Sequence, residues 1–346
     1  MQTPKAKSDV DTRERIRTLK PKVYDKVIHF DEMMATNKPI SLIQMQYRYD
    51  CNMKCQHCSV STIQHQPMNG ARTLDPSSVK DFCDQADALG WARFEFNGGE
   101  PLIVKDFDKV IQAVGPDRFH ITTVTNGWLV NESRAKHLKD LGVDRIQVSI
   151  DSLKPEDHDS FRNTRGAYYR ARRAIQVSRD IGLDTFITTT VTRERLYSPE
   201  FLAFLEYFNA EGAGIMCTFA KPVGQWTGKY DVMLNPSDMG YFKDLERRYR
   251  VFSHLTPSHG IDMGCLAVRG LIAVTPYGDV LPCQYIFVSL GNIFTEPLKD
   301  IMDRAMNLGW FRTFICPIAH DREFVRKYID PMVGKHLPVP SSEVFG

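Results

Sequence analysis

The stretch Cys51-Asn52-Met53-Lys54-Cys55-Gln56-His57-Cys58 decides how the rest of this chain is interpreted. Three residues separate the first two cysteines, and two residues separate the last two. An apolar segment from Ser41 to Tyr47 precedes the stretch and predicts a strand that ends in a cysteine-bearing loop. A loop with this spacing can wrap one face of an inorganic cluster.

Other uses of these thiols fit less well. Zinc sites ordinarily take four nitrogen or sulfur ligands, often as two Cys-x-x-Cys pairs or as a Cys pair with a His pair. The local set here ends at three thiols and His57, which lies between two of them. A disulfide framework is not expected in a long chain without a signal peptide. Three thiolates on a four-iron cluster leave one iron open to a substrate or cofactor.

Composition places the chain among ordinary globular proteins. Its 346 residues are enough for one large domain and a smaller one, and 42% of them are hydrophobic and 25% charged. The net charge of +2 gives no general attraction to nucleic acid or membrane, so neither is expected as a partner. With no apolar run of about 20 residues and no signal peptide, we expect a cytoplasmic protein. Its eight cysteines then indicate metal or redox use.

The order of predicted elements indicates the fold. Residues 1–40 predict a mobile basic arm followed by a short helix near Tyr24 to Met34. Strands and helices then alternate, with crossovers long enough for parallel pairing. The expected strands are 41–47, 92–96, 119–124, 145–150, 184–191 and 215–220, and the expected helices are 76–89, 107–114, 132–141, 169–181 and 199–209. Asp75 is expected to cap the first of these helices, with Pro76 at its first position. The pattern predicts an α/β fold, a partial parallel (βα)6 barrel whose functional groups gather at the carboxyl ends of the strands.

The chain is expected to divide into three further segments after residue 40. The barrel is expected over 41–222, and a connecting segment with an amphipathic helix near 236–249 over 223–264. Residues 265–346 are expected to form a small α+β domain and a C-terminal tail.

The spacing Cys-x3-Cys-x-aromatic-Cys, with His57 as the aromatic residue, resembles the signature of the radical S-adenosylmethionine (radical SAM) superfamily. The resemblance implies that Cys51, Cys55 and Cys58 bind a [4Fe–4S] cluster whose open iron is chelated by SAM. It also implies reductive cleavage of SAM to methionine and a 5'-deoxyadenosyl radical, which abstracts a hydrogen atom from the substrate. A flavodoxin- or ferredoxin-type protein is the expected reductant.

A SAM site is implied at the ends of the following strands. Gly98-Gly99-Glu100-Pro101 follows the second strand, where glycines allow close backbone approach and a carboxylate can pair with an ammonium group. In the superfamily a Gly-Gly-Glu motif binds the SAM amino group, so the resemblance assigns Gly98, Gly99 and Glu100 to SAM. By the same resemblance, later strand ends supply further SAM contacts from Thr125, Asn126, Ser149, Asp151 and Arg162, with Arg165 as the rival of Arg162.

A second cysteine set lies near the C-terminus. The string from Cys265 through Gly278 to Cys283 resembles the opening of SPASM and twitch domains, which hold auxiliary four-iron clusters. Gly278 is expected to turn a hairpin between Ile272 and Leu281. Only Cys316 remains as a further ligand in this region, which favours one auxiliary [4Fe–4S] cluster and the shorter twitch form. The fourth ligand is left open: His320 in a Cys-x3-His arrangement, a distal residue, or the substrate itself.

Two cysteines stand outside these sets. Cys83 lies in the middle of a predicted helix and is expected to be buried. Cys217 lies on the sixth predicted strand. If its side chain faces the barrel lumen, its thiol can return a hydrogen atom to a substrate radical, as in radical epimerases.

The expected reaction is oxidation, epimerisation or rearrangement of a small molecule resembling a sugar or aminocyclitol. One alternative is maturation of a ribosomal peptide, and an alternative outside enzymes is a zinc-stabilised binding module. Position alone suggests substrate contacts from Gln44, Gln46, Thr188, Thr190, Lys221 and Gln225.

Overall fold

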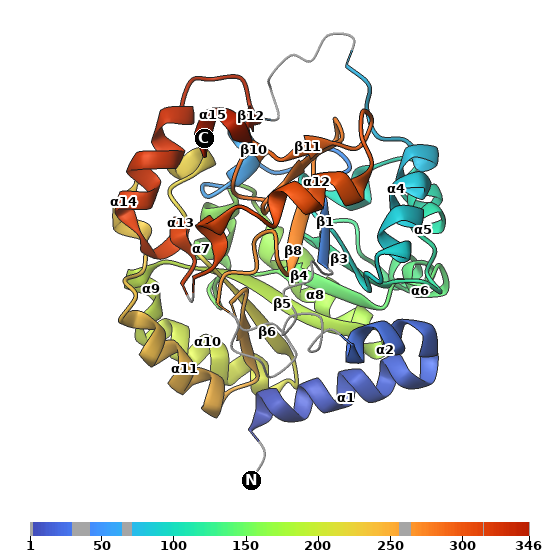
Figure 1. The fold of residues 1–346 in the computed structure, drawn as a ribbon. Helices are drawn as coiled ribbons and strands as arrows, with labels where there is room; N and C mark the ends of the chain where they lie inside the picture. The colour runs from blue at the N-terminus through green and yellow to red at the C-terminus, as the bar shows by residue number, and fades with distance from the viewer. Residues whose placement is uncertain (1–2, 30–41, 64–70, 256–263, 314, 346) are drawn as a thin grey trace.

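A ten-stranded sheet forms the centre of the protein, with strand order β11-β9-β8-β1-β2-β3-β4-β5-β6-β7. The computed structural model describes residues 3–29, 42–63, 71–255, 264–313 and 315–345. Figure 1 shows the helices packed around the outside of this curved sheet.

The six predicted barrel strands are all present and pair in parallel. Their central residues are the β-branched and aromatic types that favour a pleated, buried surface. The predicted α/β class is therefore confirmed. The strands are β1 (Leu42–Met45), β2 (Arg93–Phe96), β3 (His120–Thr125), β4 (Arg145–Ser149), β5 (Asp184–Val191) and β6 (Gly214–Phe219).

Helices connect these strands and cover the outer face of the sheet. Asp75 caps the first of them as predicted, because its carboxylate accepts from the Ser78 amide at 2.7 Å and Pro76 occupies the first turn. Two of these helices, α7 and the short α9, were not expected from the sequence. The helices are α4 (Pro76–Ala88), α5 (Phe107–Val114), α6 (Glu132–Asp140), α7 (Pro155–Arg162), α8 (Ala167–Asp180), α9 (Arg193–Leu196) and α10 (Pro199–Ala210).

The prediction of a mobile N-terminal arm is wrong. The segment forms helix α1 (Pro4–Leu19) and then α2 (Pro21–Ile28), which cross the lower edge of the molecule in Figure 1. Between them Lys20 donates to the Phe119 and Gly142 carbonyl oxygens, both at 3.1 Å, and pairs with Asp144. Lys20 thus docks on the amino ends of the strands, whereas Lys7 and Arg17 remain exposed. The rest of the expected helix, residues 30–34, lies outside the described residues.

The C-terminal region extends the barrel sheet instead of standing apart from it. Strands β8 (Leu271–Val274) and β9 (Asp279–Leu281) form the predicted antiparallel hairpin, which turns at Gly278 with φ of 84°. Strand β8 then pairs in parallel with β1, the strand that leads into the cysteine loop. At the other edge, β7 (Val251–Ser253) pairs with β6.

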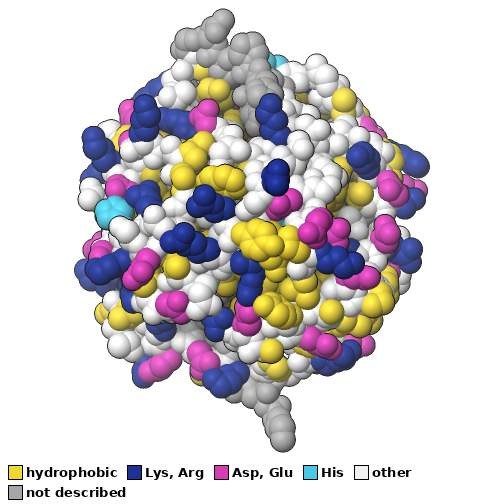
Figure 2. Space-filling view, turned by 180° about the vertical axis from the view of Figure 1, so that it is seen from behind, with side chains coloured by type: hydrophobic (Ala, Val, Ile, Leu, Met, Phe, Trp, Pro, Cys, Tyr) yellow, Lys and Arg dark blue, Asp and Glu magenta, His cyan; other side chains and the backbone are white. Residues whose placement is uncertain are grey.

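The remaining elements cover this extension. They are α11 (Asp238–Arg248), β10 (Val288–Ser289), β11 (Gly291–Asn292), α12 (Leu298–Ala305), α13 (Pro317–His320), α14 (Arg322–Phe324), β12 (Val339–Pro340) and α15 (Ser341–Val344). One hydrophobic core joins barrel residues such as Ile43 to Val274 of the extension. On the rear face shown in Figure 2, basic and acidic side chains are interspersed. Within the described ranges, no helix is long and apolar enough to cross a membrane.

Candidate active site

A single cavity of about 300 Å³ brings the two cysteine sets together. Cys51, Cys55 and Cys58 line one part of it, and the other part is lined by Cys265, Cys283 and Cys316. The first set follows β1, and Cys283 follows β9. Residues that are up to 265 positions apart in the sequence therefore line one cavity.

The two predicted glycines pack against the chain that leads into the cysteine loop. A Cβ atom at Gly99 would lie 2.0 Å from the Asp50 carbonyl oxygen, and one at Gly98 would lie 2.9 Å from that of Arg48. Gly98 also has φ of +106°, which favours glycine. The close approach that we expected toward a ligand is thus made toward the protein backbone. It fixes Glu100 beside the cysteine loop, and the Glu100 amide donates to the Asp50 carbonyl at 2.8 Å.

Glu100 is buried and held by its neighbours. Its carboxylate accepts from Thr125 Oγ1 at 2.7 Å, from the Asn126 amide at 2.7 Å and from the Leu102 amide at 3.1 Å. Burial raises the pKa of Glu100, and these donors act against that rise. Because a carboxylate can accept about four hydrogen bonds, Glu100 keeps capacity for an ammonium group in the cavity that it lines.

Asn126 connects this carboxylate to the cysteine loop. Its side-chain nitrogen donates to Asn52 Oδ1 at 2.8 Å, while its backbone amide holds Glu100. Thr125 and Asn126 therefore line the cavity and position Glu100, and their direct contact with SAM stays a prediction.

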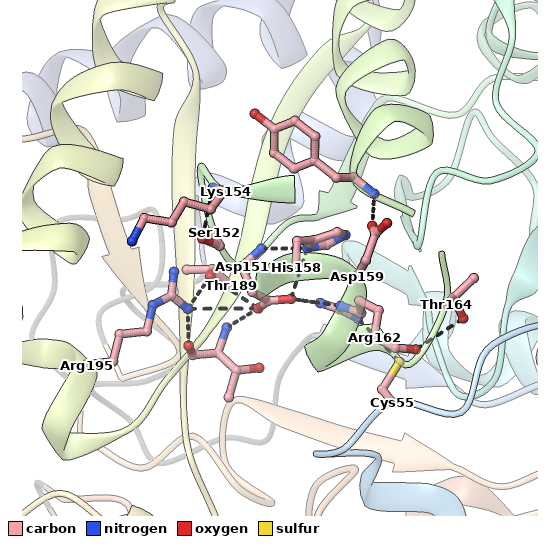
Figure 3. A network of polar contacts seen from close by, with 12 residues as sticks. Cys55, Asp151, Ser152, Lys154, His158, Asp159, Arg162, Thr164, Thr189 and Arg195 are labelled. Atoms are coloured by element: carbon pink, nitrogen blue, oxygen red, sulfur yellow. Dashed lines mark hydrogen bonds and ion pairs between the residues drawn. The ribbon is translucent and has the colours of Figure 1, made fainter. Parts of the chain in front are cut away.

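Arg162 reaches the cysteine loop from α7 (Figure 3). Its Nε donates to Asp151 Oδ2 at 2.7 Å, and its Nη1 lies 3.9 Å from Cys55 Sγ. Ser149 and Arg162 line the cavity, whereas Asp151 lies behind Arg162. Asp151 thus orients Arg162. A direct contact with SAM would require Asp151 to face the cavity, and Asp151 is not among the residues that line it. The rival, Arg165, is exposed.

The charge of Arg162 dominates the behaviour of Asp151. Burial alone would raise the pKa of Asp151, but the nearby Arg162 guanidinium lowers it to a value well below the usual range. Asp151 also accepts from the Thr190 amide at 3.1 Å. The pair is therefore charged and fixed before any ligand binds.

His57 packs as the aromatic residue of the cysteine motif. Its ring stacks on Phe161 with a centroid distance of 4.4 Å and an interplanar angle of 7°, and Trp226 lies at 5.8 Å. Burial lowers the pKa of His57 to about 3, so the ring is neutral. Its role is packing against α7 rather than proton transfer.

A buried lysine lies near the second cysteine set. Lys221 Nζ donates to the Phe219 carbonyl oxygen at 2.6 Å and lies 4.1 Å from the centre of the Tyr285 ring. Burial lowers the pKa of Lys221, and the thiols of Cys316, Cys283 and Cys265 oppose that shift. An ammonium group is thus held next to the thiols.

His320 does not turn toward the cavity in this structure. Its Nδ1 lies 3.0 Å from the Cys316 carbonyl oxygen, and its Nε2 lies 3.2 Å from Met239 Sδ. His254, which the sequence reasoning missed, lines the cavity, and neither of its ring nitrogens has a hydrogen-bond partner among the described residues. No motif surrounds His254, so the sequence offers no signal for it.

Six thiols around one cavity fit iron–sulfur clusters, because soft thiolates select such clusters and zinc. Within the described ranges, no group of three or more His, Cys, Asp or Glu side chains could hold a single metal ion. The three cysteines that follow β1 would hold the SAM-binding cluster, and Cys265, Cys283 and Cys316 would hold the auxiliary one.

Several other sequence predictions can be located. Gln44, Thr188, Thr190 and Lys221 line the cavity, whereas Gln225 is exposed and Gln46 is buried behind it, accepting from Tyr49. Cys83 is buried in the core as expected.

The hydrogen-donor role requires Cys217 to face the barrel lumen, and it does not. It is fully buried in the hydrophobic core, while its neighbours Met216 and Thr218 line the cavity. The alternation of side chains along a strand explains this outcome.

Comparison with known proteins agrees with this geometry. Residues 46–200 match the radical SAM superfamily, and residues 265–324 match SPASM, an iron-sulfur cluster-binding domain. The chain is therefore a radical SAM enzyme. More particularly, it carries a C-terminal SPASM domain, so it binds SAM at a [4Fe–4S] cluster and has an auxiliary iron–sulfur site.

Similar proteins include two named AdoMet-dependent heme synthase. The protein from Nitratidesulfovibrio vulgaris is 26% identical over 302 residues, which cover 79% of this chain and 81% of that protein. The protein from Methanosarcina barkeri is 27% identical over 303 residues, which cover 79% of this chain and 85% of that protein.

Solved structures share the fold. SuiB of Streptococcus suis bound to the precursor peptide SuiA has a TM-score of 0.60 at 15% identity, covering 81% of this chain and 69% of that chain. Native anSMEcpe with bound AdoMet has a TM-score of 0.58 at 20% identity, covering 79% of this chain and 83% of that chain.

Proposed function

We propose that this radical SAM enzyme oxidises a substrate that lies in the cavity between its two cluster sites. The observation that carries the proposal is the cavity lined by both cysteine sets. A substrate radical formed next to Cys51, Cys55 and Cys58 is then within the same cavity as the auxiliary cluster. An electron could then pass from the substrate radical to the auxiliary cluster while the substrate stays bound.

SAM bound at the first cluster supplies the 5'-deoxyadenosyl radical that removes a hydrogen atom from the substrate. Glu100 binds the SAM ammonium group, and Arg162 provides positive charge beside Cys55. Cys265, Cys283 and Cys316 would hold an auxiliary cluster able to accept one electron, so a substrate that gives up one hydrogen atom, one electron and one proton would be oxidised by two electrons overall.

The location of the cysteines favours oxidation over epimerisation. Six of the eight cysteines line the cavity in the two ligand sets, and Cys83 and Cys217 are buried elsewhere. Return of a hydrogen atom from Cys217 would require its side chain to cross the sheet.

We propose a peptide as the substrate class. The sugar or aminocyclitol that we expected from sequence finds no support among the relatives. Their name, heme synthase, makes a tetrapyrrole the second candidate. Against it, heme carries peripheral carboxylates, and the cavity wall around Glu95 presents negative charge and hydrogen-bond acceptors.

Anaerobic reconstitution tests the proposal. We expect about eight irons per chain, corresponding to two four-iron clusters, and 5'-deoxyadenosine formation on reduction. A panel of peptides and a carboxylated tetrapyrrole such as hemin would then be assayed for products lighter by two hydrogen atoms. Product formation that survives Cys265→Ala unchanged would refute an electron-accepting auxiliary cluster. Stoichiometric zinc without SAM cleavage would refute the enzyme assignment.

A further inference from the structure

One carboxylate in the cavity has no assigned role. Glu95 lies on β2 and lines the cavity. Three carboxamides surround it: Gln44 Nε2 at 3.0 Å, Asn97 Nδ2 at 3.1 Å and Gln147 Nε2 at 3.4 Å. Since an ionised carboxylate only accepts hydrogen bonds, each amide must present its nitrogen to Glu95.

This orientation leaves amide oxygens without partners. Gln44 Oε1 and Asn97 Oδ1 are buried, and neither has a hydrogen-bond partner among the described residues. Both side chains are more than nine-tenths buried and line the cavity: Gln44 is 7% exposed and Asn97 is 9% exposed. A carboxylate closed into a purely structural network would not leave two buried acceptors unpaired, because each costs about 1–3 kcal/mol.

Among the described residues, no cation pairs directly with this group, although the charge of Arg145 acts on it from a distance. Over the described ranges, no lysine or arginine forms an ion pair with Glu95, and Arg145 is paired with Asp184 at 2.7 Å. Lys221 donates to the Phe219 carbonyl oxygen instead. Burial raises the pKa of Glu95, and the surrounding amide donors oppose that rise. The site therefore combines one carboxylate with two free carbonyl acceptors.

We propose that Glu95, Gln44 and Asn97 form a subsite for a protonated primary amine of the substrate. An ammonium group has three N–H donors and no acceptor, which matches one acceptor from each of these residues. Gln44 and Glu95 are direct partners in the β1–β2 register, so the subsite is rigid. Asn97 immediately precedes Gly98, which places the amine next to the proposed SAM site.

The inference rests on the proposed function, because it assumes that the substrate binds in this cavity. It narrows the substrate to an amine, and the amine can come from a lysine side chain of a peptide or from a small molecule. The same acceptors repel the carboxylates of a tetrapyrrole.

Binding without turnover tests the subsite. The holoenzyme, with both clusters and SAM but no reductant, is titrated calorimetrically with acetyl-Gly-Gly-Lys-Gly-Gly-amide. The same peptide with norleucine or acetyl-lysine in place of lysine is the neutral probe. We expect the neutral probes to bind about tenfold more weakly, because a charge-assisted hydrogen bond is lost. Equal binding of charged and neutral probes, or no binding of any, overturns the inference.

Variants locate the effect at Glu95. Glu95→Gln is expected to abolish the preference for lysine, whereas the control Glu200→Gln removes an exposed carboxylate and should keep it. The exchange Gln44→Glu with Glu95→Gln preserves the charge and the amide pair, so it should also keep the preference. Iron content and the melting temperature establish that each variant is folded. A lysine preference that persists in Glu95→Gln overturns the assignment.

Two comparisons complete the design. N-acetyl-lysine methylamide binding as tightly as the peptide identifies a small amine as sufficient, and tighter peptide binding identifies a peptide source. Amine preference without any SAM cleavage would sink the proposed oxidation alone, whereas turnover of an uncharged substrate without amine preference would sink the subsite alone.

Discussion

The two cysteine sets are built in different ways. Cys51, Cys55 and Cys58 lie on one short loop, and their side chains are exposed or half-buried. Cys265 and Cys316 are buried, and they approach Cys283 only through the fold of the C-terminal region. The first set has Arg162 beside it, and the second has Lys221.

This difference separates a site that must admit a charged ligand from one that is enclosed. Burial raises the pKa of Cys283 to about 12 and that of Cys51 also to about 12, so thiols of both sets ionise only when a metal compensates. At the first set, Glu100 and Arg162 offer both signs of charge to an amino acid ligand. The first site is therefore suited to exchange its ligand at every turnover, and the second to keep its cluster.

The sharpest test of the comparison removes one cysteine from each set. Cys55→Ala is expected to abolish 5'-deoxyadenosine formation, because the cluster that binds SAM loses a ligand. Cys265→Ala is expected to lose about four irons but to retain SAM cleavage. Iron analysis and chromatographic measurement of 5'-deoxyadenosine distinguish the two. Loss of SAM cleavage in both variants, with the first cluster intact by spectroscopy, would contradict the division of labour.

A smaller effect is expected from the charge beside the first set. Arg162→Gln removes the 2.7 Å ion pair of the buried Asp151 carboxylate, which keeps only the longer ionic contacts to His158 at 3.7 Å and Arg195 at 3.9 Å, and should destabilise the protein by about 3 kcal/mol. Denaturant unfolding of the reconstituted protein measures this loss. The matched variant Arg165→Gln, at an exposed position, should change stability by less than about 0.5 kcal/mol.

The same pair predicts a dependence on pH. Because the folded pKa of Asp151 is depressed, its stabilising contribution is present above the unfolded value near 3.8 and is lost as the pH falls below it. The melting temperature of the wild-type protein should therefore fall between about pH 5 and pH 3 more steeply than that of Asp151→Asn. Parallel curves for the two proteins would argue against the ion pair.

At the second set, His320→Ala should leave the auxiliary cluster in place. Its ring nitrogens face the Cys316 carbonyl oxygen and Met239 Sδ. The variant is therefore expected to lose about 2 kcal/mol of stability and to keep its full iron content. Electron paramagnetic resonance of the reduced protein checks the cluster. A changed auxiliary signal would restore His320 as a ligand.

The smallest effect is expected from a cysteine outside both sets. Cys217→Ala removes one buried sulfur atom, which should cost about 1 kcal/mol and leave product formation unchanged. Chromatographic assay of product and of 5'-deoxyadenosine provides the measurement. Product loss with intact SAM cleavage would instead favour epimerisation.

Sequence patterns predicted what is local in this molecule. The six barrel strands, the Asp75 cap and the Gly278 hairpin follow from periodicity and turn residues within a few positions. The first cysteine set could be predicted because its three cysteines lie within eight residues of sequence. By contrast, the polar composition of residues 4–19 suggested a solvated arm, since docking through Lys20 depends on strand ends more than 90 residues away.

The rest of the site depends on tertiary placement. Strand alternation decided that Met216 and Thr218 line the cavity and that Cys217 does not. The network around Glu95 joins side chains from separate strands, so no spacing in the sequence predicts it. Likewise, the spacing from Cys316 to His320 suggested a ligand, whereas the local helix turns the ring toward Met239.

The pairing of β8 with β1 also constrains the order in which the molecule can be made. Strand β1 leads into the SAM-site loop, yet one of its two neighbours comes from residues 271–274. During synthesis, this edge of β1 remains unpaired until residues 271–274 have left the ribosome. An unpaired edge invites aggregation, so the nascent barrel needs protection until the C-terminal region arrives. Cluster insertion is therefore expected to be a late event in the assembly of this enzyme.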